Sequence, residues 1–278
     1  MKISIAVPSF NYCRYLGDCL ESIRAQTHRD LEVLIADAGS SDGSVAVIEA
    51  FCAKDPRFRL VSRHDEGQAD AVNKALKHAS GDVLCFLNAD DLYITDTALA
   101  AVVKAFSATP EVDVVTMGGW FVDSGGGRIR PVRYRYHPLD SMKLMKYRTI
   151  VLQPATFWKR RVSDQLEFDS SFHFAFDVLF FYRAWLEFAW READVAVAGY
   201  RWHGENKSAT ISEQRIRELA ALERYKFGAT HWRGAYLEWI ATLVGTLNRS
   251  RPGKVANRLV RVLVNGMAYA SVYRMPGI

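Results

Sequence analysis

The first 120 residues alternate short apolar segments with segments of helical spacing, and this alternation restricts the fold more than any other feature. Strands are predicted at 3–7, 31–36, 57–62, 83–87 and 112–117, and helices at 15–26, 44–54, 68–79 and 95–107. Strands separated by helices of about 10–15 residues pair in parallel through right-handed crossovers. The sequence therefore predicts an α/β protein with a mostly parallel sheet flanked by helices.

The pattern changes after residue 117. Glycines at 118, 119 and 125–127 are expected to break the chain, and a β-like stretch follows with arginines at 128, 130, 133 and 135. A further strand is predicted at 151–159 and an aromatic-rich helix at 174–190. The segment 211–272 has helical spacing with an interruption near 251–253, so we expect a helical C-terminal extension.

Composition excludes several classes of protein. The chain has 278 residues, 49% of them hydrophobic, which is enough for a full core and unlike disordered or collagenous chains. No segment approaches the roughly 18–20 uninterrupted apolar residues of a membrane span. The N-terminus leads directly into a predicted strand, and none of the four cysteines forms a CxxC pair. We therefore expect a cytoplasmic protein without a signal peptide, with reduced, buried cysteines.

Positive charge is concentrated at the C-terminus. Residues 239–278 hold six basic and no acidic residues, whereas the first 238 residues carry a net charge of −1. Lys254, Arg258 and Arg261 form one stripe with apolar neighbours, which is typical of a cationic amphipathic helix. Such a helix lies on an anionic membrane surface or packs on the protein with its charges in water. No nucleic-acid motif is present, so we expect no nucleic-acid partner.

The tips of the predicted strands hold the candidate site residues, because ligands of parallel sheets bind beyond the carboxyl ends of the strands. Asp90 and Asp91 follow the strand at 83–87, and a divalent cation with bound phosphates would offset their repulsion. Asp91 would alternatively cap the next helix. Asp37, at the tip of the strand at 31–36, is suited to accept a hydrogen bond from a nucleobase.

The helix predicted at 68–79 has a polar face that includes Asp70, Asn73 and Lys74. Such residues near a helix N-terminus suit a polyphosphate ligand, although a face exposed to water has the same pattern. The functional interpretation is favoured for Asp70, and the solvated one for Lys77.

Four motifs, in this order, resemble the family 2 glycosyltransferases, which are inverting enzymes of the GT-A fold. They are AVPSFN at 6–11, LIADAGSSDG at 34–43, DEGQADAVNK at 65–74 and GDVLCFLNADD at 81–91. Looser similarity continues through LQPATFW at 152–158, Asp177 and YRWH at 200–203. The resemblance implies a Rossmann-like catalytic domain at 1–215, with a nucleotide-sugar half at 1–117 and an acceptor half at 118–215. A basic helical extension at 216–278 would follow.

The resemblance also implies roles for individual residues. A nucleotide-sugar pocket would include Pro8, Ser9, Asn11, Asp37, Asp70, Asn88 and Asp90, with Asp37 on the base, commonly uracil. Asp91 and His203 would hold Mn²⁺ or Mg²⁺, and Asp177 would be the general base. Asn88 departs from the family pattern, because many members have an aspartate there, and Phe176 stands where an acidic residue is common. Asp177 would alternatively cap its helix.

Acceptor-side roles rest on the same resemblance. Gln153, Thr156 and Trp158 alternate along the predicted strand at 151–159 and would approach the acceptor, with Trp158 stacked on a sugar. A core position is the alternative for this tryptophan. The arginines at 128–135 would form a solvated edge or contact a phosphate-bearing acceptor.

The expected reaction moves a sugar from a nucleotide donor, UDP-linked by resemblance, to a hydroxyl of a glycan or lipid-linked acceptor with inversion. A cation would stabilise charge on the leaving diphosphate, and a carboxylate would take the acceptor proton. The resemblance implies a role in cell-surface polysaccharide or glycolipid synthesis, in the cytoplasm or peripherally at the inner membrane face. A nucleotidyltransferase and a nucleotide-sugar-binding module without turnover are the alternatives. A nucleotidyltransferase usually has a glycine-rich loop, and 8–14 contains no glycine.

Overall fold

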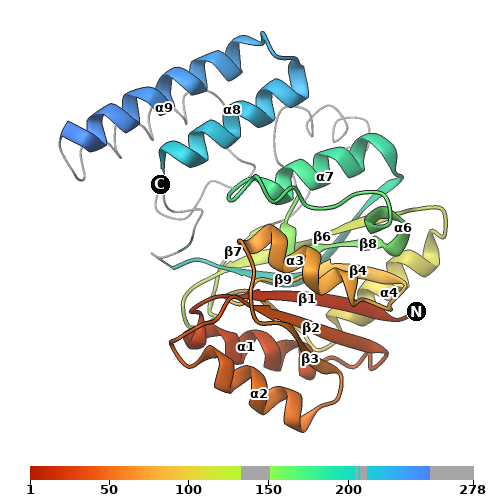
Figure 1. The fold of residues 1–278 in the computed structure, drawn as a ribbon. Helices are drawn as coiled ribbons and strands as arrows, with labels where there is room; N and C mark the ends of the chain where they lie inside the picture. Colours follow the sequence, from red (N-terminus) through yellow and green to blue (C-terminus); the bar gives the residue numbers. More distant parts are fainter. Residues whose placement is uncertain (133–150, 204–205, 207–211, 251–278) are drawn as a thin grey trace. The chain divides into compact units, whose positions relative to one another are not determined.

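A strand buried along its whole length, β1 (Ile3–Ser9), lies inside the parallel half of the sheet (Figure 1). Its neighbours are β2 (Leu31–Asp37) and β4 (Val83–Phe86), and β3 (Phe58–Ser62) pairs with β2, all in parallel. Burial on both faces explains the continuous apolar runs in the sequence. The computed structural model describes residues 1–132, 151–203, 206 and 212–250.

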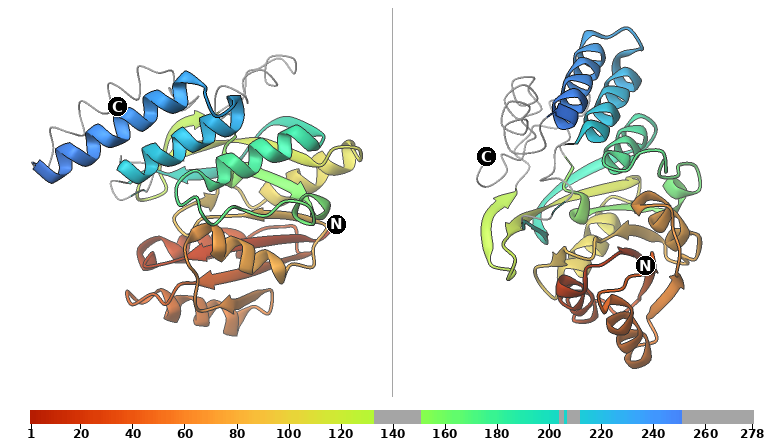
Figure 2. Two further views of the ribbon diagram at one scale, coloured as in Figure 1. Left: turned by 45° about the horizontal axis from the view of Figure 1, so that its top comes forward. Right: turned by 60° about the vertical axis from the view of Figure 1, so that its left-hand side comes forward.

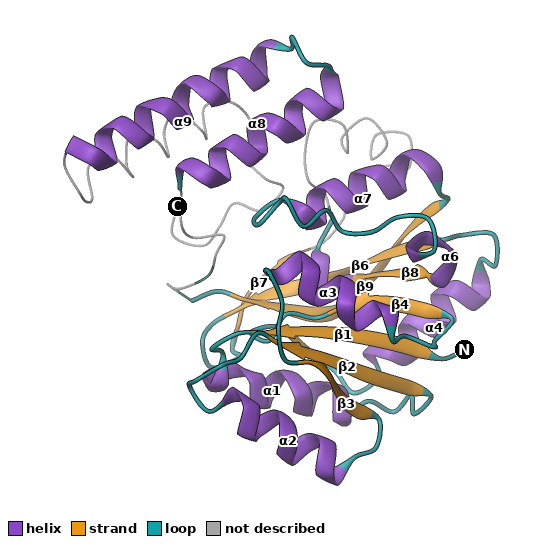
Figure 3. Cartoon of the chain, in the orientation of Figure 1, coloured by secondary structure: helices purple, strands orange, loops and turns teal. Residues whose placement is uncertain are grey.

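The first three helices cover both faces of this half (Figure 3). Two consecutive right-handed crossovers place α1 (Cys13–Arg24) and α2 (Ser44–Lys54) on one face. The connection from β3 to β4 runs back across the sheet, so α3 (Gln68–Lys77) lies on the other face, against β1 and β2. The carboxyl ends of β1, β2 and β4 therefore meet at one edge, as the alternating pattern predicts.

The second half of the sheet is mixed. In the described residues the strand order is β3-β2-β1-β4-β8-β6-β9-β5, with β7 paired to β6, and both views in Figure 2 show the sheet twisting. Antiparallel pairs join β4 to β8, β8 to β6, β6 to β7 and β9 to β5, whereas β6 and β9 are parallel. The bounds are β5 (Leu92–Tyr93), α4 (Ala98–Ala108), β6 (Val114–Val122), β7 (Arg128–Val132), β8 (Thr156–Lys159), α6 (Arg160–Ser163), α7 (Phe176–Glu187) and β9 (Trp190–Arg201).

Strand β6 continues through Gly118 and Gly119, where the sequence predicts a break. A Cβ atom on Gly119 would lie 2.3 Å from the carbonyl oxygen of Ala198 in β9, which is closer than atoms can approach. These glycines let the two backbones come together inside the sheet. A packing requirement, rather than a turn, therefore explains them.

The strand predicted at 151–159 is only half formed. Gln153–Ala155 is a 3₁₀ turn, η1, and β8 begins at Thr156. Pro154 has no N–H to donate to a neighbouring strand, which accounts for the late start. Strands β5 and β9 are not predicted from the sequence, because β5 has two residues and β9 begins with a charged segment.

Two other expectations are partly confirmed. All four cysteines are free, and Cys19 and Cys85 are buried, but Cys13 at the start of α1 and Cys52 on α2 are partly exposed. Arg128 and Arg130 lie on β7, with their guanidinium groups over the rings of Trp120 and Phe121. The arginines at 133 and 135 lie outside the described residues.

The chain divides into two compact units. One comprises Met1–Arg135, Val151–Ser170 and Phe180–Trp202, and the other includes Ser171–Leu179 and the chain from His203 onward. The second unit thus combines a short segment around Asp177 with the C-terminal part of the chain, and the domain boundary at 215 stays a prediction.

Helices α8 (Glu213–Phe227) and α9 (Trp232–Ser250) of the second unit lie side by side in both views of Figure 2. They share an apolar cluster of Ile216, Ala220, Leu237, Ile240, Ala241 and Val244. No helix in the described part of the chain is both long and apolar enough to traverse a bilayer. The basic helix expected at 249–274 lies almost entirely outside the described residues.

At the amino ends of the parallel strands, a buried carboxylate of β2 bonds to β1 and to the chain before β4. Glu32 of β2 is 6% exposed and accepts hydrogen bonds from the Ser4 hydroxyl at 2.6 Å and the Ser80 N–H at 2.6 Å. Lys2 donates to its other oxygen at 3.2 Å. Burial alone would raise the pKa of Glu32, but these hydrogen bonds outweigh it and lower the pKa to about 2.

We expect Glu32→Gln to lower the free energy of unfolding by roughly 2 kcal/mol near neutral pH, because only the ionised group gains from these bonds. An unfolded glutamate has a pKa of 4.5, so this stabilisation is complete above pH 4.5 and disappears as pH falls toward 2. Urea unfolding of both proteins across this range measures it. The exposed Glu21→Gln is the matched control, and a deficit that stays constant with pH would contradict the prediction.

Candidate functional site

The tips of β1 and β2 form the first part of the candidate site. Ser9 and Asp37 are register partners, and Pro8 faces Ala36 beside them. Asn11 has a positive φ of 56°, and its side-chain oxygen accepts the N–H of Ser41 at 2.9 Å. Ser9 is 4% exposed, and its hydroxyl oxygen finds no hydrogen-bond partner among the described residues. Buried polar atoms without partners are rare, so this hydroxyl is available to a ligand.

Asp37 is nearly enclosed by its own loop. It is 1% exposed, and its Oδ1 accepts the N–H groups of Gly39 at 3.0 Å and Ser40 at 2.7 Å. Oδ2 accepts the rotatable hydroxyl of Ser40 at 2.8 Å. The backbone bonds fix the side chain, and a turn of one hydroxyl would free Oδ2 for a nucleobase.

Asp70 has a structural function at the start of α3. Its carboxylate accepts the N–H of Glu66 at 2.9 Å and pairs with Lys74 at 2.7 Å. Asp65, which the sequence analysis left without a role, has a buried Oδ2 with no hydrogen-bond partner among the described residues. Burial, followed by the charges of Asp70 and Asp37, raises the pKa of Asp65. Asp65 Oδ2 is therefore a further polar atom that a ligand could bind.

Asn88 connects three segments beyond the tip of β4. Its oxygen accepts from Gln68 Nε2 at 2.6 Å, and its amide nitrogen donates to Gln153 Oε1 at 3.0 Å and to Asp91 Oδ2 at 3.3 Å. A carboxylate cannot donate, so an aspartate here would face two acceptors across the same contacts. The departure from the family pattern therefore has a local explanation, because an amide satisfies both sides.

Asp91 is buried within this network. It is 1% exposed, and its Oδ1 accepts the backbone N–H of Arg201 at 2.9 Å, so protein donors reach both oxygens. Burial and the neighbouring Asp90 charge raise the pKa of Asp91 well above its ordinary value. Asp90 is 9% exposed and is the more accessible of the pair.

Arg201, at the end of β9, holds the turn that carries both aspartates. Its guanidinium is fully buried and donates to the carbonyl oxygens of Asp90 and Ser124, each at 2.7 Å. It also pairs with Asp18 at 3.1 Å and lies over the Tyr15 ring. No role is predicted for this residue from the sequence, although an arginine at the end of the predominantly apolar segment 195–201 was a usable signal.

The acceptor-side prediction is wrong for Trp158 and Thr156. Trp158 is fully buried, and its ring packs on Phe168, Phe180 and Phe181. Thr156 is also fully buried and bonds to Thr116 at 3.0 Å. Both side chains are enclosed because β8 lies inside the sheet, between β4 and β6. Gln153 differs, since it donates to the Phe86 carbonyl at 2.7 Å and supports Asn88.

Asp177 and His203 belong to the second unit. Asp177 lies in the first turn of α7 and accepts the N–H of the next residue, Val178, at 2.8 Å. Burial raises its pKa to about 6, and the charge of Arg215 opposes this shift. His203 is 7% exposed and donates its backbone N–H to Asn206 Oδ1 at 2.6 Å.

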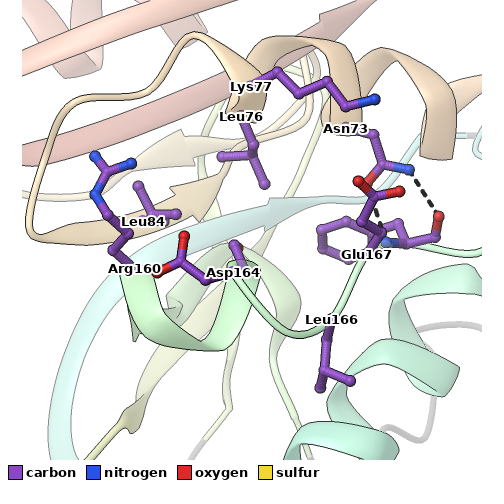
Figure 4. Close-up of a pocket in the computed structure, with 10 residues that line it drawn as sticks. Asn73, Leu76, Lys77, Leu84, Arg160, Asp164, Leu166 and Glu167 are labelled. Carbon is purple, nitrogen blue, oxygen red and sulfur yellow. Dashed lines mark hydrogen bonds between the residues drawn. The ribbon is translucent and has the colours of Figure 1, made fainter.

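The cavity in Figure 4 lies elsewhere in the first unit. It has a volume of about 210 Å³ and is lined by Asn73, Leu76, Lys77, Leu84, Arg160, Ser163, Asp164, Leu166, Glu167 and Phe168. Ligand pockets usually measure about 300–1,000 Å³. The candidate strand-tip residues do not line this cavity, so it is not the nucleotide pocket.

The described residues contain no cluster of three or more histidine, cysteine, aspartate or glutamate side chains arranged to enclose a metal ion. Mg²⁺ and Mn²⁺ need fewer protein ligands when phosphates and water complete their coordination. The carboxylate of Asp90, which is the more exposed of the pair, fits a cation shared with a bound diphosphate.

Comparisons with known proteins identify related chains. The family model described as glycosyl transferase family 2 matches residues 4–166. An uncharacterized glycosyltransferase of Nostoc sp., alr2836, is 36% identical over 116 residues, which cover 41% of this chain and 36% of that protein. Chondroitin synthase of Pasteurella multocida is 36% identical over 104 residues, or 37% of this chain and 11% of that protein. The matched segments thus span only a minor part of these relatives.

Solved structures share the fold. Staphylococcus aureus TarS 1–349 in complex with UDP-GlcNAc aligns over 96% of this chain and 80% of its own, with a TM-score of 0.67 and 18% identity. The mannosyltransferase PcManGT of Pyrobaculum calidifontis, in complex with GDP-Man and Mn²⁺, aligns over 98% and 81%, with a TM-score of 0.61 and 20% identity. The fold is therefore GT-A, as the resemblance implied. With the strand-tip geometry and a family match over more than half its length, the chain belongs to glycosyl transferase family 2.

Proposed function

We propose that this protein transfers a sugar from a nucleotide-sugar donor to an acceptor hydroxyl with inversion of the anomeric configuration. The observation that carries the proposal is the convergence of Ser9, Asp37, Asn88 and Asp90 at one edge of adjacent parallel strands in a family 2 chain. The structures of TarS with UDP-GlcNAc and of PcManGT with GDP-Man support a nucleotide-sugar donor.

The strand tips offer atoms suited to the nucleotide. Asp37 Oδ2 would accept an N–H of the base, a geometry that uracil satisfies, after the Ser40 hydroxyl turns away. The unpartnered Ser9 hydroxyl beside it would donate to the ribose or diphosphate, with Pro8 and Asn11 completing the wall. Asp70 would lie near the ribose or donor sugar, while its Oδ2 accepts the Glu66 N–H and pairs with Lys74.

A divalent cation, Mn²⁺ or Mg²⁺, would bind between Asp90 and the donor diphosphate, with His203 as a further candidate ligand. We assign Asp90 the direct contact, because it is the more exposed of the pair, at 9% against 1% for Asp91. When bound, the cation neutralises negative charge on the leaving diphosphate. Asp91 and Arg201 would hold the Asp90 turn in place, and the Mn²⁺ complex of PcManGT supports this cofactor class.

Asp177 would take the proton of the attacking hydroxyl. Its pKa of about 6 makes the side chain an anion at neutral pH and a stronger base than an ordinary aspartate. Attack on the face opposite the leaving diphosphate, with a single carboxylate as base, inverts the anomeric centre. The buried pair Trp158 and Thr156 has no part in acceptor binding.

A glycan or lipid-linked acceptor remains our proposal, in cell-surface polysaccharide or glycolipid synthesis at the inner membrane face. Trp232 and Trp239 on α9 are 60% and 56% exposed, and such aromatic side chains favour the membrane interface. The six basic residues from 239 onward would add attraction to anionic lipid. The name of the Pasteurella relative, chondroitin synthase, supports a polysaccharide product.

A panel of nucleotide sugars tests the proposed function directly. With Mn²⁺ present, a preferred donor should raise the melting temperature and release nucleoside diphosphate, because a ligand of the folded state stabilises it. Release of pyrophosphate would instead identify a nucleotidyltransferase. Tight donor binding without any product would identify a binding module.

The aspartate pair separates metal binding from structural support. We expect Asp90→Ala to raise the Mn²⁺ concentration for half-maximal rate at least about tenfold, with little change in melting temperature. Asp91→Ala should lower the free energy of unfolding by about 1–3 kcal/mol, because two buried donors lose their acceptor. Metal activation curves and urea unfolding measure the two effects. A changed Mn²⁺ requirement only in Asp91→Ala would reverse the assignment.

The proposed base gives a pH dependence. At saturating Mn²⁺, kcat/KM should fall as pH drops through about 6, because Asp177 takes up a proton there. Asp177→Asn should lower kcat by about 10²–10⁴-fold, with donor affinity unchanged. Asp194→Asn, an exposed change on β9, serves as the control. An Asp177→Asn enzyme that keeps the wild-type rate would exclude Asp177 as the base.

A further inference from the structure

One carboxylate of the second unit has an unusual set of partners. Glu218 of α8 is 7% exposed and accepts the backbone N–H groups of three consecutive residues. The distances are 2.9 Å from His173, 2.7 Å from Phe174 and 3.1 Å from Ala175. Bonds from N–H groups to an ionised carboxylate are among the stronger hydrogen bonds in proteins. This contact therefore fixes the backbone of residues 173–175.

Those three residues lead directly into α7. Its first residue is Phe176, and Asp177, the proposed base, follows in the first turn. Three bonds to one side chain orient three successive peptide groups, which leaves the following residue little freedom to rotate or shift. Asp177 lies only two to four residues after the three amides that Glu218 binds. The direction of its side chain therefore depends on Glu218.

We propose that Glu218 is a positioning residue for Asp177, and that α8 is in this way part of the catalytic apparatus rather than an appendage. The proposal rests on the proposed function, since it takes Asp177 as the base. Arg215 lies three residues before Glu218 on α8, so the two share a helix face. The positive charge of Arg215 opposes the rise of the Asp177 pKa. The helix face that carries Glu218 therefore also acts on Asp177 electrostatically.

The support for Glu218 is itself firm. Ile216 and Ala220, on either side of Glu218 in the sequence, are buried in the apolar cluster shared with α9. The Ser212 hydroxyl caps the first turn of α8 by accepting the N–H of Arg215 at 3.1 Å. A capped and packed helix presents Glu218 from a fixed position. Small displacements of a reacting group cost rate steeply, about 10²-fold for 1 Å.

Two substitutions with a matched control test this role. Glu218→Ala should lower kcat by about 10–100-fold, because the loop before Asp177 loses its anchor. Glu218→Gln should recover part of that loss, since its one carbonyl oxygen still accepts from the loop. The dissociation constant of the donor nucleotide should stay unchanged in both variants. Glu213→Gln, a change on the same helix that removes an exposed pair with Arg217, should keep the wild-type kcat.

Amide hydrogen exchange gives a readout that needs no turnover. The N–H groups of His173, Phe174 and Ala175 should exchange faster in Glu218→Gln and fastest in Glu218→Ala, with α9 unaffected. If Glu218→Ala is unstable, the Glu218→Gln variant alone tests the proposal, through its kcat and the exchange rates of the three amides. Wild-type kcat in that variant, or unchanged exchange at the three amides, overturns the proposal.

The same experiments keep this inference apart from the proposed function. If Asp177→Asn retains full activity, the assignment of the base is wrong, whatever Glu218 does. If Asp177→Asn is inactive while both Glu218 variants keep wild-type kcat, the base assignment stands and the positioning role is excluded. A fall in donor affinity together with kcat would make Glu218 a general structural residue, which also contradicts the proposal.

Discussion

Two adjacent carboxylates cannot be held at the tip of a buried strand unless donors surround them, and Arg201 supplies the central ones. Its backbone N–H reaches Asp91, and its guanidinium holds the Asp90 carbonyl, the Ser124 carbonyl and Asp18. Asn88 adds an amide donor from the opposite side. With Asp91 enclosed in this way, Asp90 is the more exposed carboxylate of the pair. The burial of Asp91 therefore explains why Asp90 is the candidate cation ligand.

This arrangement joins parts of the chain that are distant in sequence. Arg201 follows Asp91 by 110 residues, and it reaches the turn because β9 pairs both with β6 and with the short β5 just after Asp91. Gly118 and Gly119 allow the β6–β9 pair to form by leaving space between the backbones. Gly118 and Gly119, which the sequence suggests are breaks, thus allow the strand pairing that brings Arg201 to the turn of Asp90 and Asp91.

The same physical principle recurs in the second unit. Glu218 is a buried carboxylate that gains its stability from backbone N–H groups, and Asp37 is held by its loop in a similar way. In each case an anion organises the backbone around it, and the energetic requirement is that every buried oxygen finds a donor. The unpartnered Ser9 hydroxyl and Asp65 Oδ2 are exceptions in the described residues, and both lie in the motifs that carry the family resemblance.

The sequence by itself determined the parallel half of the sheet, its flanking helices and the strand-tip candidates, because apolar periodicity and turn residues are local signals. It also determined the family, through motifs at Pro8–Asn11, Asp37, Asp70 and Asn88–Asp91. Only the tertiary structure decided that Trp158 and Thr156 are core residues, since β8 enters the sheet between β4 and β6. It also decided which of Asp90 and Asp91 is the more exposed, that Arg201 holds their turn, and that Glu218 binds the segment before Asp177. Burial and long-range hydrogen bonds depend on how separate segments pack, and local sequence patterns do not record that packing.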